Sequence, residues 1–140
     1  MTESVVPPRS KARRVAPAIA GALLGLMFAA FALMFLLKLV PIPPPPDDGS
    51  PMAMFMVAFN TTGYMTFVKM FELLGGILVA IPRTRNLGLL VLGPIIINIL
   101  AFHGFVMGGE GLFNPILILI VVLALFLLWC ERRAFGGLLR

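Results

Sequence analysis

The 140-residue chain has few charged residues. Only 12% of its residues are Asp, Glu, Lys or Arg, while 60% are hydrophobic and the mean hydropathy is +1.05. An ordinary soluble domain contains about 25% charged residues. Because this chain cannot cover a water-facing surface, a soluble globular fold is excluded. Disorder is excluded too, since it requires low hydrophobicity and high net charge. The composition indicates an integral membrane protein.

Residues for thiol and metal chemistry are equally scarce. Cys130 is the only cysteine, which excludes an internal disulfide, a C-x-x-C redox pair and a Cys-rich metal site. Met52, Met54 and Met56 alternate along the chain and could form a soft copper(I) site. No His or Cys supports that reading nearby, and thioethers that fill packing gaps are the simpler interpretation. We expect no metal site.

Four apolar segments are long enough to cross a bilayer. A spanning helix needs about 20 mostly apolar residues, because the hydrocarbon core is ~30 Å thick. No alternation of period two predicts a membrane strand. We therefore predict an all-α, integral membrane four-helix bundle in one domain. Its spans are 15–40, 64–81, 87–105 and 114–130, with an outer loop and interfacial segment at 41–63 and tails at 1–14 and 131–140.

Helix boundaries and contacts are marked by a few residue types. The proline-rich run 41–46 should end the first helix, because proline lacks an N–H donor and favours an extended chain. Asn114–Pro115 predicts the start of the last helix, with Asn as its cap and Pro in its first turn. Gly21 and Gly25 form a G-x-x-x-G pattern, which is typical of close helix packing.

The distribution of Lys and Arg predicts the orientation. The basic residues lie in the two tails and in the loop between the second and third spans: Arg9, Lys11, Arg13, Arg14, Arg83, Arg85, Arg132, Arg133 and Arg140. The other two loops contain Asp47, Asp48 and Glu110 and no Lys or Arg. Both termini are expected to be cytoplasmic. The net charge of +5 is then a topology signal, and no nucleic-acid binding is expected.

Two ionisable residues lie within the second span. Each such residue costs roughly 2.5–3.5 kcal/mol at mid-helix and therefore needs a reason. Lys69 and Glu72 are three residues apart, close enough on a helix for an ion pair. Gly76 lies on the same stripe, and small residues let helix backbones approach. We expect this face to point into the bundle.

The third span adds polar residues at a similar depth. Asn98 lies about 10 Å below the outer end of its helix, nearly level with Glu72. The preceding Gly93–Pro94 predicts a kink, because proline removes a backbone hydrogen bond. His103 and Lys38 lie nearer the outer ends of their helices. Polar residues on one side of the midplane favour a half-depth pocket over a channel or pump.

The same residues also have a purely structural interpretation. The Lys69–Glu72 pair could simply neutralise itself and bridge helices, with Asn98 forming an interhelical hydrogen bond worth about 0.6 kcal/mol. Lys38 is expected to extend to the lipid head groups. His103 could pack at the interface, since in a regular helix it points about 140° away from Asn98.

Segments K-M-F-E-L-L-G-G at 69–76, G-P-I-I-I-N-I at 93–99 and F-H at 102–103 resemble the DoxX-like family of small four-helix bacterial membrane proteins. The likeness is specific over 64–103 and elsewhere concerns hydropathy only. It implies a bacterial inner membrane and a polar core of Lys69, Glu72, Asn98 and His103. Name-giving members are associated with a thiosulfate:quinone oxidoreductase and some relatives with thiol-redox assemblies, whereas most members have no established activity.

We therefore expect an accessory subunit of a quinone- or thiol-linked membrane redox system, and not an enzyme on its own. Its outer-half pocket would bind a quinone-like head group or a redox partner protein. Glu72 would accept a proton or hydrogen bond, Lys69 would balance its charge, and Asn98 and His103 would orient the ligand. A scaffold is the alternative. A small-solute carrier ranks third, because it needs polar residues in the inner half. Ligand, partner and any homo-oligomer stay open.

Overall fold

The structure, a computed structural model, describes residues 11–138. Within this range the regular structure is entirely helical and contains no strand, which confirms the predicted all-α class. Arg9 and Arg140 of the predicted tails lie outside the described residues. The elements are α1 (Lys11–Leu36), α2 (Pro51–Thr61), α3 (Tyr64–Ala80), α4 (Arg85–Ala101), the π-helical turn η1 (Phe102–Val106) and α5 (Pro115–Leu138).

Three of the predicted spans are long and apolar enough to cross a membrane. They are Arg13–Leu36, Arg85–Val106 and Pro115–Gly137. The fourth, α3, has 17 residues and reaches spanning length only together with α2, from which it is bent by 79°. The long apolar helices suggest a membrane protein with three crossings, or up to four if the bent pair α2–α3 is one of them.

Several helix ends differ from their predicted positions. The described part of α1 already begins at Lys11, within the predicted tail, and α4 begins at Arg85 rather than at residue 87. Helix α1 ends at Leu36 rather than at residue 40, because the chain turns at Lys38, whose φ of 53° is left-handed. Helix α5 begins at Pro115 as predicted, and the Asn114 side chain caps it by accepting a hydrogen bond from Ile116 N at 2.9 Å. However, α5 continues to Leu138, so the expected tail from residue 131 is largely helical.

Glycines let α1, α3 and α4 approach closely. A Cβ at Gly25 would collide with the carbonyl oxygen of Gly76, and one at Gly88 would collide with the backbone of Val79. A Cβ at Gly21 would lie 2.8 Å from the carbonyl oxygen of Val79. Backbone atoms cannot move aside as flexible side chains can. The packing seam predicted from Gly21 and Gly25 is confirmed, and α3 contacts α1 on one side and α4 on the other.

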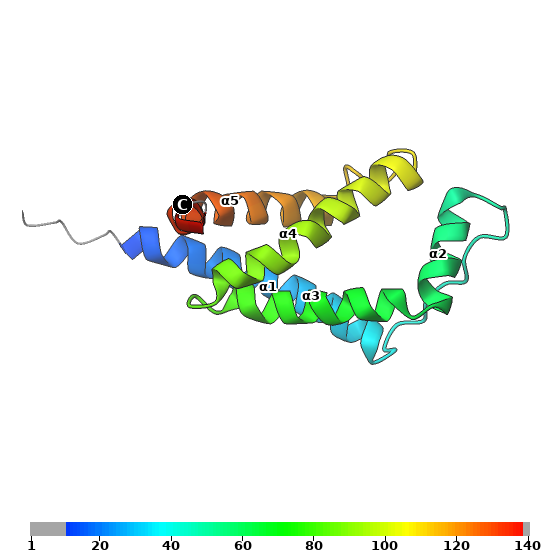
Figure 1. Ribbon diagram of the computed structural model, residues 1–140, viewed down its shortest axis with the longest axis horizontal. Helices are drawn as coiled ribbons and strands as arrows, with labels where there is room; N and C mark the ends of the chain where they lie inside the picture. Colours follow the sequence, from blue (N-terminus) through cyan, green and yellow to red (C-terminus); the bar gives the residue numbers. More distant parts are fainter. Residues whose placement is uncertain (1–10, 139–140) are drawn as a thin grey trace, which may run out of the picture.

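The helices spread apart toward one end. In Figure 1, α1 and α3 lie side by side, while α4 starts next to α3 and then crosses toward the first turns of α5. We call the end with the start of α1, the α3–α4 turn and the last turns of α5 the arginine end. The opposite end, with the proline-rich loop, α2 and η1, is the proline end. There α2 reaches η1 through Phe55 and Phe102, whose ring centroids are 4.8 Å apart.

The core lies between α1, α3, α4 and α5, nearer the arginine end. Helices α1, α4 and α5 each contribute an apolar stripe to it, as amphipathic packing requires, and α3 contributes Val79. The α5 stripe recurs at helical spacing and turns one face of this helix inward. The buried residues of the core are Ala20, Leu24, Phe28, Val79, Leu89, Leu92, Ile96, Ile120, Ala124 and Leu127.

Candidate functional site

Helix α3 contains a buried ion pair. Lys69 Nζ donates a hydrogen bond to Glu72 Oε2 at 2.7 Å, as their three-residue spacing predicts. The Glu72 side chain is only 5% exposed and that of Lys69 20%. Lys69 therefore keeps limited access to the surroundings, whereas the carboxylate lies within the bundle.

Register along α3 explains why Glu72 points inward. Residues four and seven positions apart lie on the same helix face. Gly76 and Val79 occupy those positions relative to Glu72, and both contact α1, while Val79 also contacts Gly88 of α4. The Glu72 side chain is thus on the face that α3 presents to the other helices. The expectation that this polar face turns inward is confirmed.

The pair neutralises itself within one helix. Glu72 Oε1 accepts no hydrogen bond from any residue in 11–138, and Lys69 and Glu72 form no side-chain hydrogen bond to another helix in that range. A bridge inside α3 cannot fix how α3 is positioned against its neighbours. Of the structural interpretation, the mutual neutralisation of the pair is therefore seen and a bridge to another helix is not seen within residues 11–138, which leaves one carboxylate oxygen without a protein donor.

Asn98 does not join this pair. It is exposed on α4 and forms no side-chain hydrogen bond with a residue in the described range. The reason is the course of α4. Its glycine contact holds it against α3 near Gly88, and Leu92 packs against Gly75, but beyond that point α4 leans toward α5 (Figure 1). Equal depth in two helices does not bring residues together when the helices diverge.

His103 is held by its own segment. It lies in η1, where the helix widens into a π-helical turn after passing through Gly93 and Pro94. The ring Nδ1 is 2.8 Å from the carbonyl oxygen of Ile99, and a Cβ at Gly111 would lie 2.7 Å from the ring. Its contacts are therefore local to the proline end and do not include Glu72.

Lys38 and the methionines of α2 also lie at the proline end. Lys38 is exposed and lines a cavity of about 440 Å³ with Asn60 and residues of the proline-rich loop. Because α2 is helical, side chains two positions apart point in different directions. Met54 is 64% exposed, whereas Met52 and Met56 are partly buried. The three thioethers do not converge as a copper site would require.

The burial of one charged residue was not predicted from the sequence. Arg85, predicted as a loop residue that only sets topology, is the first residue of α4 and is 5% exposed. Its Nη1 lies 3.4 Å from Glu131 Oε1 of α5. A hydropathy window treats a charge at the end of a span as loop. The available signal was Glu131, an acidic residue between an apolar helix and two arginines.

This finding corrects the expectation that buried ionisable residues lie in one half only. Arg85 is at the arginine end, and Glu72 is at the middle of α3. The fully buried side chains between them are apolar: Leu24, Val79 and Leu92. Within residues 11–138, no side-chain hydrogen bond or ion pair links Glu72 to Arg85.

Comparison with known proteins gives one relative. The chain is 35% identical to the uncharacterized protein YwoB of Bacillus subtilis (strain 168) over 91 residues, which are 61% of this chain. The match spans 56% of that protein, so this chain corresponds to little more than half of its length. No family model matches the chain, and no solved structure matches it.

Proposed function

We propose that this chain is a multi-pass protein of a bacterial inner membrane that acts as a ligand-binding, non-catalytic subunit of a redox system. In this proposal the bundle has four crossings, both termini are cytoplasmic, and the protein is DoxX-like. The Lys69–Glu72 pair is its binding element. The supporting observation is a carboxylate that is buried in the helix bundle, paired within its own helix and hydrogen-bonded through only one oxygen.

The cost of such a pair supports a role beyond packing. Two charges taken out of water are repaid only by good geometry and by further hydrogen bonds. Here the 2.7 Å contact supplies the geometry, but the second carboxylate oxygen lacks a protein donor among the described residues. That oxygen is not among the buried side-chain atoms without a partner, so it keeps some accessible surface, through which a ligand hydroxyl or N–H group would donate to it. Ionisable residues inside spans mark functional sites by default for this reason.

The charge balance restricts the ligand class. Lys69 and Glu72 together are neutral, so a charged ligand would be attracted by one member and repelled by the other. A neutral head group with hydroxyl or carbonyl oxygens can accept from Lys69 and donate to Glu72 without adding a charge to the interior. A quinone or quinol head group has this chemistry, and its apolar tail is soluble in the bilayer.

A series of aromatic side chains lies on a different face of α3 from the pair, since Phe67 and Phe71 are exposed whereas Glu72 points into the bundle. A continuous series of ring contacts runs from α2 into α3 and ends at Phe71, beside Glu72 in the sequence. Its centroid distances are 3.8 Å for Phe55–Phe59, 4.7 Å for Phe59–Tyr64, 5.9 Å for Tyr64–Phe67 and 4.8 Å for Phe67–Phe71. These rings stack on one another at the surface of α2 and α3 and do not bear on the ligand class at Glu72.

The test is the quinone content of the purified protein. Full-length protein is extracted from native membranes in a mild detergent, and bound quinone is quantified per chain. We expect Glu72→Gln to lower the content at least fivefold, because it removes the charged acceptor. Glu110→Gln, which changes an exposed glutamate in the loop before α5, should leave it unchanged. Equal quinone in all three proteins, or none in the wild type, would refute the proposal.

A further inference from the structure

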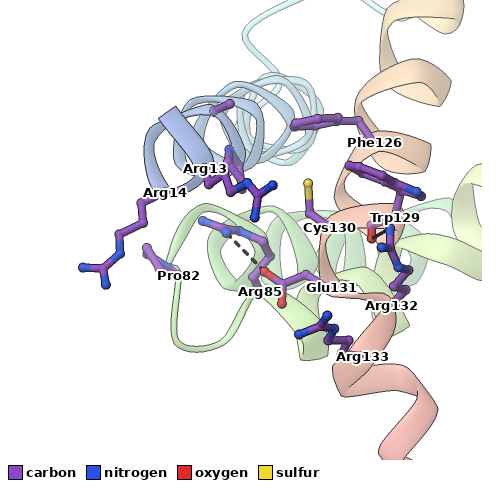
Figure 2. A pocket seen from close by; sticks show the side chains of 12 residues that line it. Arg13, Arg14, Pro82, Arg85, Phe126, Trp129, Cys130, Glu131, Arg132 and Arg133 are labelled. Carbon is purple, nitrogen blue, oxygen red and sulfur yellow. Dashed lines mark hydrogen bonds and ion pairs between the residues drawn. The ribbon is translucent and has the colours of Figure 1, made fainter. Parts of the chain in front are cut away.

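A cavity lies at the arginine end, and neither Lys69 nor Glu72 lines it. It has a volume of about 780 Å³, within the range typical of ligand sites. Its walls come from the start of α1, the α3–α4 turn and the last turns of α5 (Figure 2). Five arginines and one acidic residue, Glu131, line the cavity. The arginines are Arg13, Arg14, Arg85, Arg132 and Arg133.

Arg85 forms the deepest polar part of this cavity. Although it is 5% exposed, its Nε and Nη2 atoms have no hydrogen-bond partner among the described residues. Its one ionic contact, to Glu131, is 3.4 Å long, which is beyond the usual range for a charge-assisted bond. A buried guanidinium with unpaired N–H groups is costly. Both atoms have almost no accessible surface, and Nε lies next to Gly21 of α1, so an acceptor in the cavity would bond to them once the Arg85 side chain turns toward the opening.

The neighbouring groups make the site selective for anions. In Figure 2, Arg13 extends from α1 toward the space in front of Arg85, whereas Glu131 lies on the α5 side. Glu131 is the only acidic side chain in the lining, so positive charge prevails. Guanidinium groups bind phosphate oxygens through two parallel hydrogen bonds, which a single ammonium cannot do.

The remaining wall is apolar. Phe126, Trp129 and Pro17 line the cavity beside the arginines, and the Arg132 guanidinium lies 4.6 Å from the centroid of the Trp129 ring. Tryptophan and arginine at the end of an apolar helix are typical of the level of the lipid head groups. A ligand that fits both walls has a phosphate and an adjoining apolar part.

We infer that this arginine cavity is a binding site for a phosphate ester, whose membrane source is the head group of an anionic phospholipid. The phosphate would accept hydrogen bonds from Arg85 and Arg13, and the glycerol and first acyl carbons would contact Phe126 and Trp129. Basic pockets between membrane helices bind anionic lipid head groups in this way. The inference is independent of the function proposed for Glu72.

The experiment uses the only tryptophan of the chain as its probe. Trp129 lines the cavity, so its fluorescence should report occupancy. Full-length protein in a neutral detergent is titrated with short-chain phosphatidylglycerol, with phosphatidylcholine and with inorganic phosphate. We expect a saturable change with phosphatidylglycerol and none with phosphatidylcholine. Saturation by inorganic phosphate at equal concentrations would keep the site and identify free phosphate as its ligand.

Matched variants separate this site from general surface charge. Arg85→Gln should weaken phosphatidylglycerol binding about tenfold, because a hydrogen-bonded charge is lost. Arg83→Gln removes the same charge from an exposed residue of the same turn that does not line the cavity, and should bind like the wild type. Glu131→Gln should bind more tightly, since it removes the competing carboxylate.

A second variant at the same position keeps the inference testable if Arg85→Gln does not fold. Arg85→Lys keeps the charge but loses the two-pronged geometry, and we expect weakening between those of wild type and Arg85→Gln. The inference is overturned if phosphatidylglycerol and phosphatidylcholine act alike. It is also overturned if Arg83→Gln weakens binding as much as the Arg85 variants, or if Glu131→Gln does not strengthen it.

Discussion

The close contact between α3 and α4 at Gly88 can be tested by adding a single methyl group, in the variant Gly88→Ala. A Cβ added at Gly88 would meet the backbone nitrogen of Val79 and would lie 2.7 Å from Val79 Cα and 2.8 Å from the carbonyl carbon of Leu78. All three are backbone atoms. Non-bonded carbon atoms are optimally about 3.5–4.0 Å apart. Gly88→Ala therefore forces the two helices apart by roughly 1 Å.

The expected cost follows from two opposing effects. Overpacking a tight contact costs about 1–3 kcal/mol, and a rigid backbone neighbour places this site at the upper end. Alanine recovers about 1 kcal/mol through its higher helix propensity. We expect a net loss of about 2 kcal/mol in the free energy of unfolding. Leu89 and Leu92, which are buried in the same part of α4, would lose packing with it.

Gly93 supplies the matched control in the same helix. A Cβ there meets nothing within 4 Å. The following Pro94 restricts any larger residue before it and reduces the propensity gain, so Gly93→Ala should change stability by less than about 1 kcal/mol. Both variants are unfolded in mixed detergent micelles with increasing dodecyl sulfate, and helix content is followed by circular dichroism. Equal stability of the two variants would refute the close contact of α3 and α4.

Two further predictions concern single hydrogen bonds. Lys69→Met leaves the Glu72 charge unpaired and should lower the free energy of unfolding by about 3–5 kcal/mol, whereas Lys69→Met with Glu72→Leu should restore most of it. If the double variant also keeps full quinone content, the pair is only a packing element. In α2 the Ser50 hydroxyl oxygen caps the helix by accepting a hydrogen bond from Ala53 N at 3.2 Å. Ser50→Ala removes this cap and should cost about 1 kcal/mol of local helix stability.

The Ser50 variant also has a pH signature. The hydroxyl and backbone N–H of Ser50 lower the pKa of Asp48 below its ordinary value of 3.8. A lowered pKa in the folded state stabilises that state above the ordinary value, and this contribution disappears as the pH falls through the lowered pKa. Ser50→Ala should bring the Asp48 pKa back toward 3.8, as carboxyl chemical shifts will report. An unchanged Asp48 titration would exclude the contribution of the Ser50 hydroxyl, because the backbone hydrogen bond from Ser50 N to Asp48 Oδ1 remains in the variant.

Local features of the fold could be predicted from the sequence because their causes are local. Apolar length predicted the long helices, the three-residue spacing predicted the Lys69–Glu72 pair, and Asn114 predicted the start of α5. The G-x-x-x-G pattern at Gly21 and Gly25 also predicted a close helix contact. Each of these signals lies within one continuous stretch of sequence, although the partner of the glycine seam, α3, could not be read from it.

The arrangement of helices could not be predicted in this way. Asn98 was placed level with Glu72 by counting residues, but the angle at which α4 leaves α3 depends on packing along its whole length. Likewise, the burial of Arg85 depends on α5 continuing past residue 130, which brings Glu131 beside it. Both errors arose where residues far apart in the sequence determine the environment.

The account depends most on Glu72 being paired with Lys69 and open to a ligand. Solid-state NMR of full-length protein in lipid vesicles, with 15N-labelled lysine and 13C-labelled glutamate, tests this directly. Lys69–Glu72 is the only Lys–Glu ion pair in residues 11–138, so we predict one Nζ–Cδ correlation that Glu72→Gln abolishes. We predict that a short-chain quinone or quinol shifts the Glu72 Cδ signal and leaves that of Glu110 in place. A missing correlation, or a signal that no quinone moves, would contradict the account.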